Sequence, residues 1–116
     1  MFTKQYKFFS LKHAYHGSVG SSANLTNTGT WNANFRGGFE FDRFPWPHTY
    51  RGAHQDVDSL VRDVEETLTA AQVENKIAGW IFEPIQGVGG LNPLPAGFAP
   101  RVAELVRKKG GLVVAD

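Results

Sequence analysis

The chain has 116 residues, of which 41% are hydrophobic and 13% aromatic, a composition typical of a globular domain with an apolar core. Its formal net charge is +1, with 12 basic and 11 acidic residues mixed along the sequence, so charge gives no argument for a nucleic-acid or membrane partner. The absence of cysteine excludes disulfides and thiolate metal sites, and because the four histidines lack zinc-ligand spacing, we expect no bound metal.

The first half of the chain combines one expected strand with a long stretch that has no periodicity. Residues 5–12, QYKFFSLK, are rich in aromatic side chains and predict a β-strand. The small residues from 18 to 25 are compatible with a short helix. Residues 26–53 are dense in Gly, Asn, Pro and aromatic residues, and we expect them to form one long loop. A loop of this length in a compact domain usually has a function.

The second half alternates helical and strand patterns. Apolar residues recur at helical spacing between residues 56 and 73, with Asp56 or Asp58 as the candidate N-cap. Residues 77–82, IAGWIF, form an apolar run typical of a strand that is covered on both faces. After a Gly/Pro-rich loop, the pattern predicts a second amphipathic helix, which ends at the Gly110–Gly111 pair.

The last expected element is a short strand, residues 112–115, which we expect to be buried and which delivers Asp116 at its tip. The order strand, helix, strand, helix, strand, with apolar strands, predicts an α/β fold with a parallel sheet between helices. Three strands and about two to three helices are too few elements to form such a sheet and cover both of its faces. We therefore expect an incomplete domain.

Three segments that could carry chemistry follow the three expected strands: HAYHG, EPIQGVGG and Asp116. Because ligands of open α/β sheets bind at the carboxyl ends of the strands, these segments can build one pocket. The residues alone leave simpler explanations open, since Tyr15 and His16 could pack a turn and Glu83 could be a solvated strand end. The glycines of the second segment could be ordinary turn glycines, because their spacing is not that of a phosphate loop.

Taken together, the segments YHG, FEPIQGVGG and GGLVVAD resemble the class-III aminotransferases, which depend on pyridoxal 5'-phosphate (PLP) and have fold type I. In that family an aromatic-His-Gly turn follows one strand, an EPxQG loop follows a second, and a third strand ends in an acid. The similarity runs from about Ser10 to Asp116 and is greatest to the type-2 alanine–glyoxylate aminotransferase subgroup. It implies that residues 1–116 form the central part of the PLP-binding large domain.

The resemblance implies cofactor-binding roles for five residues. Tyr15 matches the aromatic residue that stacks on the pyridine ring, and His16 supports it from the same turn. Asp116 matches the acid that pairs with the pyridine nitrogen and keeps it protonated. Glu83 matches the glutamate of EPxQG, near the nitrogen side of the cofactor, with Gln86 as its neighbour.

Two parts of the family's site are expected outside this chain. The segment that holds the cofactor phosphate should precede Met1, and the Schiff-base lysine should follow Asp116. None of the lysines in the chain stands at that place, so we expect no catalytic residue in it and no activity of the chain alone. Val88 stands where aminotransferases with an arginine gate carry a glutamate, which disfavours ornithine- or GABA-type substrates.

For the whole protein, the resemblance implies transfer of an amino group from alanine, or a similar donor, to glyoxylate or another 2-oxo acid. It also implies small-molecule amino-acid and oxo-acid partners, a homodimer or larger homo-oligomer, and a mitochondrial location that rests on the resemblance alone. Two alternatives stay open: a related PLP-dependent phospho-lyase, and a non-catalytic, truncated scaffold protein.

Overall fold

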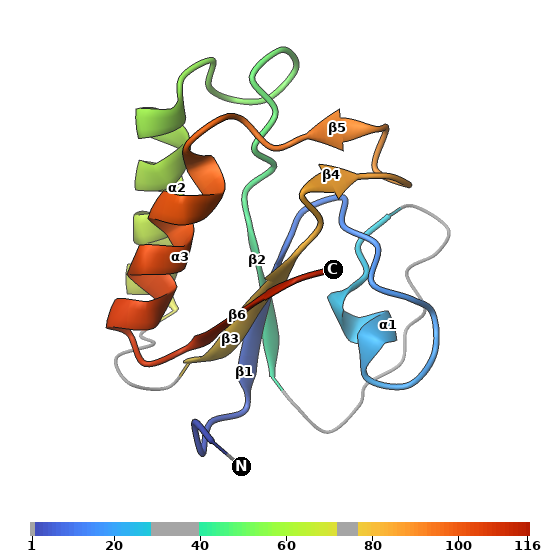
Figure 1. The fold of residues 1–116 in the computed structure, drawn as a ribbon, viewed down its shortest axis with the longest axis vertical. Helices are drawn as coiled ribbons and strands as arrows, with labels where there is room; N and C mark the ends of the chain where they lie inside the picture. The colour runs from blue at the N-terminus through green and yellow to red at the C-terminus, as the bar shows by residue number, and fades with distance from the viewer. Residues whose placement is uncertain (1, 29–39, 72–76) are drawn as a thin grey trace.

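The fold is built around a parallel β-sheet of four strands in the order β2-β1-β3-β6 (Figure 1). The computed structural model describes residues 2–28, 40–71 and 77–116. Helices lie on both faces of the sheet, so the predicted α/β class with a parallel sheet is confirmed. The strands of this sheet are β1 (Lys7–Leu11), β2 (Phe41–Phe44), β3 (Ile77–Phe82) and β6 (Leu112–Ala115).

The strand β2 lies within the stretch that we expected to be one long loop, so that expectation and the count of three strands were wrong. β2 runs parallel to β1, with Phe41 opposite Phe8 and Phe44 opposite Leu11. An edge strand of four residues between glycine- and proline-rich segments has too few positions to show a period. Its conformation is fixed by the backbone of β1, which no local pattern reveals. Residues 29–39 of the expected loop lie outside the described residues.

The three helices agree with the sequence patterns. They are α1 (Ser22–Leu25), α2 (Val57–Ala70) and α3 (Phe98–Lys108). Asp56 is the N-cap of α2, since its side chain accepts a hydrogen bond of 2.7 Å from the backbone N–H of Ser59. α3 stops at Gly110, whose φ of 80° is in the left-handed region that glycine adopts most easily. Residues 72 and 73 of the helix expected at residues 56–73 lie outside the described residues.

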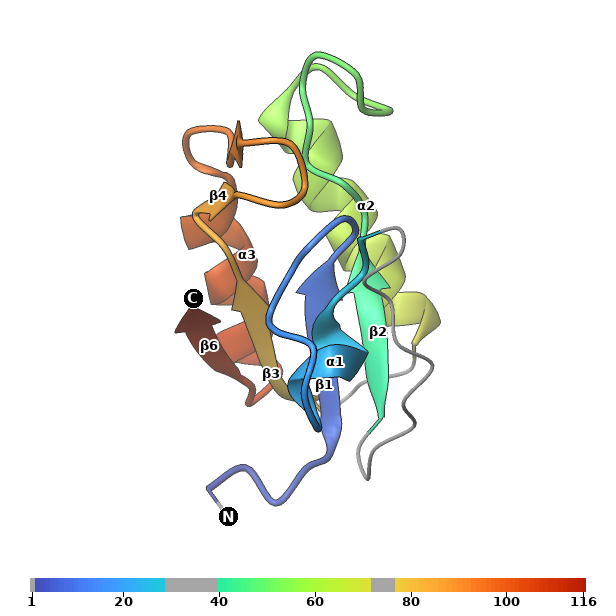
Figure 2. The ribbon, with the colours of Figure 1, turned by 90° about the vertical axis from the view of Figure 1, so that its right-hand side faces the viewer.

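The hydrophobic core lies between the sheet and the pair α2 and α3, which cover the same face (Figures 1 and 2). Trp80 of β3 is fully buried and its ring stacks on Phe82 with 4.2 Å between centroids. Phe9 of β1 stacks on Phe44 of β2 at 4.6 Å. The apolar face of α3 packs on this layer through Phe98 and other buried residues. The short helix α1 lies on the opposite face of the sheet.

The strand β6, which we expected to be buried, lies at the edge of the sheet within the described residues. It pairs only with β3 in the described residues, and Leu112 and Val114 are 46% and 44% exposed. An apolar run predicts a strand, but its burial depends on what lies beside it, which the run itself does not encode.

The connection between β3 and α3 contains a small antiparallel ribbon of two strands. It consists of β4 (Ile85–Gln86) and β5 (Asn92–Pro93).

Within the described part of the chain, none of the helices has the length and hydropathy needed to cross a bilayer.

Candidate functional site

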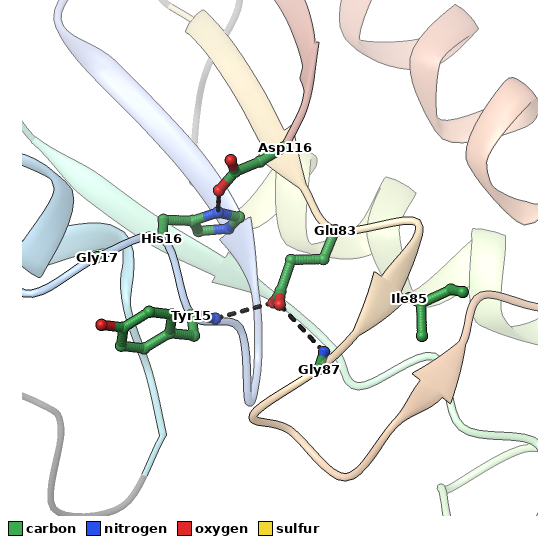
Figure 3. Close-up of a pocket in the computed structure, with 7 residues that line it drawn as sticks. All are labelled: Tyr15, His16, Gly17, Glu83, Ile85, Gly87 and Asp116. Carbon is green, nitrogen blue, oxygen red and sulfur yellow. Dashed lines mark hydrogen bonds and ion pairs between the residues drawn. The ribbon is translucent and has the colours of Figure 1, made fainter.

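A pocket opens where the strands β1, β3 and β6 end, at the carboxyl edge of the sheet (Figure 3). Its volume of about 430 Å³ is in the range of small-molecule sites. All three segments that the sequence analysis singled out contribute to it. The residues that line it are Tyr15, His16, Gly17, Glu83, Ile85, Gly87 and Asp116.

The ring of His16 and the carboxylate of Asp116 form a close pair in this pocket. Nδ1 of His16 lies 2.8 Å from Oδ2 of Asp116 (Figure 3). The histidine side chain is 1% exposed and the aspartate side chain 50% exposed, so the acid is anchored on one side and open on the other. The backbone N–H of Asp116 donates to the carbonyl of Phe82 at 2.9 Å, which continues the pairing of β6 with β3 up to the acid.

The second ring nitrogen of His16 has no hydrogen-bond partner among the described residues. Nε2 is buried, and buried polar atoms in folded proteins are almost always paired with protein, water or a ligand. If Nδ1–H donates to the carboxylate, Nε2 is left as an acceptor. This atom is therefore a place where a bound molecule or a water can complete the site.

Thr26, the residue that follows α1, holds the turn that carries Tyr15 and His16 through hydrogen bonds to its backbone. The backbone N–H of His16 donates to the Thr26 hydroxyl at 2.9 Å, and that hydroxyl donates to the carbonyl of Gly17 at 2.6 Å. Thr26 is fully buried, so both contacts are shielded from water. A single hydroxyl thus holds two consecutive residues of the turn.

Arg43 on β2 binds the backbone of the segment that contains Thr26. Its guanidinium donates to the carbonyls of Asn24 and Thr26, the second at 3.3 Å. Burial lowers the pKa of the Arg43 guanidinium, against the opposing effect of the Asp42 carboxylate. Because Arg43 satisfies carbonyls at the end of α1, it ties β2 to the segment that holds the turn.

Glu83, the first residue after β3, uses both carboxylate oxygens within the site. Oε2 accepts from the backbone N–H of Tyr15 at 2.9 Å, and Oε1 accepts from the backbone N–H of Gly87 at 3.2 Å (Figure 3). The side chain therefore joins the turn after β1 to the loop after β3.

Of the five residues predicted to bind a cofactor, Gln86 is the one that does not line the pocket. It is fully buried, and its Nε2 donates to the carbonyl of Lys12 at 2.9 Å. Its Oε1 accepts from the side chain of Asn92 at 3.4 Å, which links β4 to β5. The geometry places Gln86 beneath the loop as a support for the backbone.

Three lining residues were not named as site residues from the sequence: Gly17, Ile85 and Gly87. All three lie inside the motifs YHG and EPIQG, so the motif positions themselves were the available signal. In residues 2–28, 40–71 and 77–116, no group of three or more His, Asp or Glu side chains could hold a metal ion. No lysine lines the pocket within the same residues.

Comparison with known proteins agrees with the motifs. The profile of the aminotransferase class-III family matches residues 1–116. The mitochondrial alanine–glyoxylate aminotransferase 2 of Homo sapiens is 32% identical over 130 residues, which cover 92% of this chain and 25% of that protein. A solved (S)-enantioselective omega-transaminase from Thermomicrobium roseum has a TM-score of 0.83 and 31% identity, over 95% of this chain and 26% of its own. An amine transaminase from an uncultivated Pseudomonas species, solved in the PLP-bound form, has a TM-score of 0.81 and 28% identity, over 96% of this chain and 26% of its own.

The chain thus spans about a quarter of the length of the proteins that it matches. Over that quarter, the sequence and the arrangement of the sheet agree with the same group of enzymes. The chain belongs to the class-III aminotransferase family, whose members use PLP as their cofactor.

Proposed function

We propose that this chain is the central part of the PLP-binding large domain of an aminotransferase, and that PLP binds in the pocket at the tips of β1, β3 and β6. The observation that carries the proposal is the pair of Asp116 and His16. An apolar strand delivers one acid to a pocket, and a buried histidine holds it there at 2.8 Å while half of the acid stays exposed. Membership of a PLP-dependent family supports the choice of cofactor.

The residues present fit the pyridine end of PLP. The open side of the Asp116 carboxylate can accept an N–H from a ring nitrogen, and a charge-assisted bond of this type is among the stronger hydrogen bonds in proteins. Tyr15 lines the same pocket and supplies an aromatic surface for a flat ring. The buried Nε2 of His16, without a partner in the described residues, is a further polar atom at this end.

When bound, PLP supplies a protonated aromatic ring that withdraws electrons from the reacting carbon of an amino-acid substrate. Asp116 holds the proton at the ring nitrogen, because a carboxylate at hydrogen-bond distance favours the charged ring. His16 fixes the orientation of that carboxylate through Nδ1. Tyr15 packs on the ring and keeps water from that face. Among the residues that the structure describes, no lysine lines the pocket, so we expect the chain to be inactive until other parts of the protein supply one.

For the substrates, we propose alanine or a similar amino donor and glyoxylate or another 2-oxo acid as acceptor. This choice is supported by the 32% identity to the human alanine–glyoxylate aminotransferase 2 and by Val88 at the gate position. We also propose a mitochondrial location, as in the name of that relative, and a homodimer or larger homo-oligomer. A panel of amino donors and oxo acids assayed with the full-length protein tests the substrate choice, and release of phosphate from phosphoethanolamine would instead indicate a phospho-lyase.

The cofactor site is tested by the variant Asp116→Ala in the full-length protein that contains this chain. We expect PLP to bind roughly 10- to 100-fold more weakly, which corresponds to the loss of one hydrogen bond to a charged group. Turnover should nearly disappear, because the ring nitrogen is no longer kept protonated. The measurements are a titration of the cofactor absorbance band and a transamination assay.

The matched control is Asp58→Ala, which removes an acid that is 77% exposed on α2 and pairs with Arg101. We expect this variant to keep wild-type PLP affinity and turnover. Wild-type turnover in Asp116→Ala would refute the assigned role. Absence of PLP binding by the wild-type, full-length protein would support the non-catalytic scaffold.

A further inference from the structure

The carboxylate of Glu83 is engaged by two backbone N–H groups that come from different segments of the chain. Tyr15 belongs to the turn after β1, and Gly87 belongs to the loop after β3; their N–H groups donate to opposite oxygens at 2.9 Å and 3.2 Å. A carboxylate is an acceptor-only group, so it suits two N–H donors better than any neutral side chain of its size. We call this arrangement the Glu83 bridge.

Two further contacts join the same two segments. The side chain of Gln86 donates to the carbonyl of Lys12 at 2.9 Å from a fully buried position. Gly89 lies so close to the turn that a Cβ at this position would be 2.5 Å from the carbonyl oxygen of His13. Every one of these contacts acts on the backbone of the turn. The loop after β3 and the turn after β1 therefore form one connected unit at the edge of the sheet.

From this geometry we propose that Glu83 is a positioning residue, which sets the place of Tyr15 in the cofactor pocket by holding its backbone N–H. The inference rests on the proposed function, and it gives Glu83 an indirect part in cofactor binding, through the backbone of Tyr15. Glu83 holds the backbone of Tyr15 itself. If this backbone shifts, the aromatic ring of Tyr15 shifts with it, and the ring is the aromatic surface of the pocket.

Both carboxylate oxygens of Glu83 are engaged by backbone N–H groups. The role that this geometry supports is therefore acceptance of hydrogen bonds from the backbone rather than transfer of a proton to a substrate.

Two substitutions separate these roles in the full-length protein. Glu83→Gln keeps the shape and one acceptor oxygen but carries neither negative charge nor titratable proton. Since the contact to Tyr15 is the shorter of the two, we expect the amide oxygen to stay on Tyr15 and to release Gly87. Glu83→Ala removes both acceptors. The matched control is Glu104→Gln, the same change on α3, where Glu104 is exposed and pairs with Lys108 at 2.8 Å.

The first measurement is hydrogen exchange of single amides in the cofactor-free protein, which does not depend on activity. In Glu83→Ala we expect the amides of Tyr15 and Gly87 to exchange about tenfold faster or more, as for the loss of a hydrogen bond to a charged acceptor. In Glu83→Gln, Gly87 should exchange faster while Tyr15 stays near the wild-type rate. Glu104→Gln should change neither amide. An unchanged Tyr15 amide in Glu83→Ala would overturn the proposal.

The second measurement is PLP affinity, with the circular dichroism of the bound cofactor and the pH profile of turnover. We expect Glu83→Ala to lose affinity about tenfold with an altered dichroism band, because Tyr15 has moved. Glu83→Gln, which keeps an acceptor for Tyr15, should recover most of this affinity and leave the pH profile unshifted. Equal losses in the two variants, or a changed pH profile in Glu83→Gln, would show that charge or a proton matters and would overturn the proposal. Failure of the wild-type protein to bind PLP, with a faster Tyr15 amide in Glu83→Ala, would instead overturn the proposed function and support the bridge.

Discussion

At the scale of single residues, the pair of His16 and Asp116 divides one task between a buried and an exposed group. The histidine is 1% exposed and contributes orientation, whereas the aspartate is 50% exposed and stays open to a ligand. The family resemblance implied only a supporting role for His16 beside Tyr15, because a contact between residues 100 positions apart leaves no local pattern in the sequence. The geometry gives His16 a partner of its own.

This division of tasks predicts how substitutions of His16 alone affect PLP binding. In the full-length protein, we expect His16→Phe to weaken PLP binding about tenfold, since the carboxylate loses the donor that orients it. His16→Asn, which keeps a donor close to the position of Nδ1, should restore part of the affinity. The measurement is a titration of the cofactor absorbance band for each variant.

The two sites should also be coupled. Because His16 acts through Asp116, the double variant His16→Phe with Asp116→Ala should bind PLP about as weakly as Asp116→Ala alone. Fully additive losses would mean that His16 contacts the cofactor on its own and would contradict the assigned division.

At the scale of elements, α2 depends on the cap at Asp56. Its pKa is lowered by the hydrogen bond from the backbone N–H of Ser59, then by Ser59's side chain, so the charged carboxylate is the form that stabilises the helix. A lowered pKa in the folded state means that this stabilisation is complete above the pKa of the unfolded chain. It is lost as the pH falls through the lower, folded-state value.

In thermal melts of the full-length protein at neutral pH, we therefore expect Asp56→Ala to lower the melting temperature of the unit that contains α2 by a few degrees. Asp56→Asn, which keeps a capping oxygen, should lower it less. The gap between the wild type and Asp56→Asn should narrow when the melts are repeated below the pKa of free aspartate. A gap that widens in acid would contradict the sign of the pKa shift.

The elements also show which parts of the fold the sequence could predict. The strands at Ile77–Phe82 and Leu112–Ala115 have the predicted bounds, because each is an apolar run that ends at a polar residue or a glycine. The capped helix was predicted from a different local signal, a single apolar stripe at helical spacing that follows an aspartate N-cap. The strand at Phe41–Phe44 was missed, since its four residues gain their conformation from pairing with β1.

For the site, the sequence predicted that three segments would meet, and they do. It could not predict the contacts inside the pocket, which depend on where backbone N–H groups point. Glu83 was predicted to lie near the nitrogen side of a cofactor with Gln86 as its neighbour; the structure adds that both oxygens of Glu83 accept from the backbone and that Gln86 donates to the carbonyl of Lys12. The motif residues therefore predicted the region of the site, whereas the hydrogen bonds of each side chain came from the structure.

At the scale of the whole molecule, the two edges of the sheet determine whether the isolated 116-residue chain associates with other chains. β2 and β6 are the outer strands in the described residues, and β6 exposes Leu112 and Val114. A strand edge with exposed apolar side chains is a template for association with other chains. We therefore expect the isolated chain to aggregate and to melt over a broad range of temperature. A sharp, cooperative melt of a monomer would contradict this.

The same reasoning gives a test by substitution. Val114→Lys places a charge on the edge strand and should raise the monomeric fraction of the isolated chain in size-exclusion chromatography with light scattering. The matched control is Val19→Lys, because Val19 is 81% exposed but lies outside the sheet. Equal gains from both variants would mean that added charge, rather than the edge of β6, controls the association.

The contact between His16 and Asp116 joins residues 100 positions apart, and this has a consequence for synthesis on the ribosome. At typical translation rates, the turn with His16 exists for about 5–20 s before the acid that completes it has been made. During that time the core strands can pair, but the pocket lacks its carboxylate. If PLP binds in this pocket as proposed, a nascent chain gains its full affinity for the coenzyme only after β6 has joined the sheet, so tight binding of vitamin B6 would report that the polypeptide has been made and folded as far as Asp116.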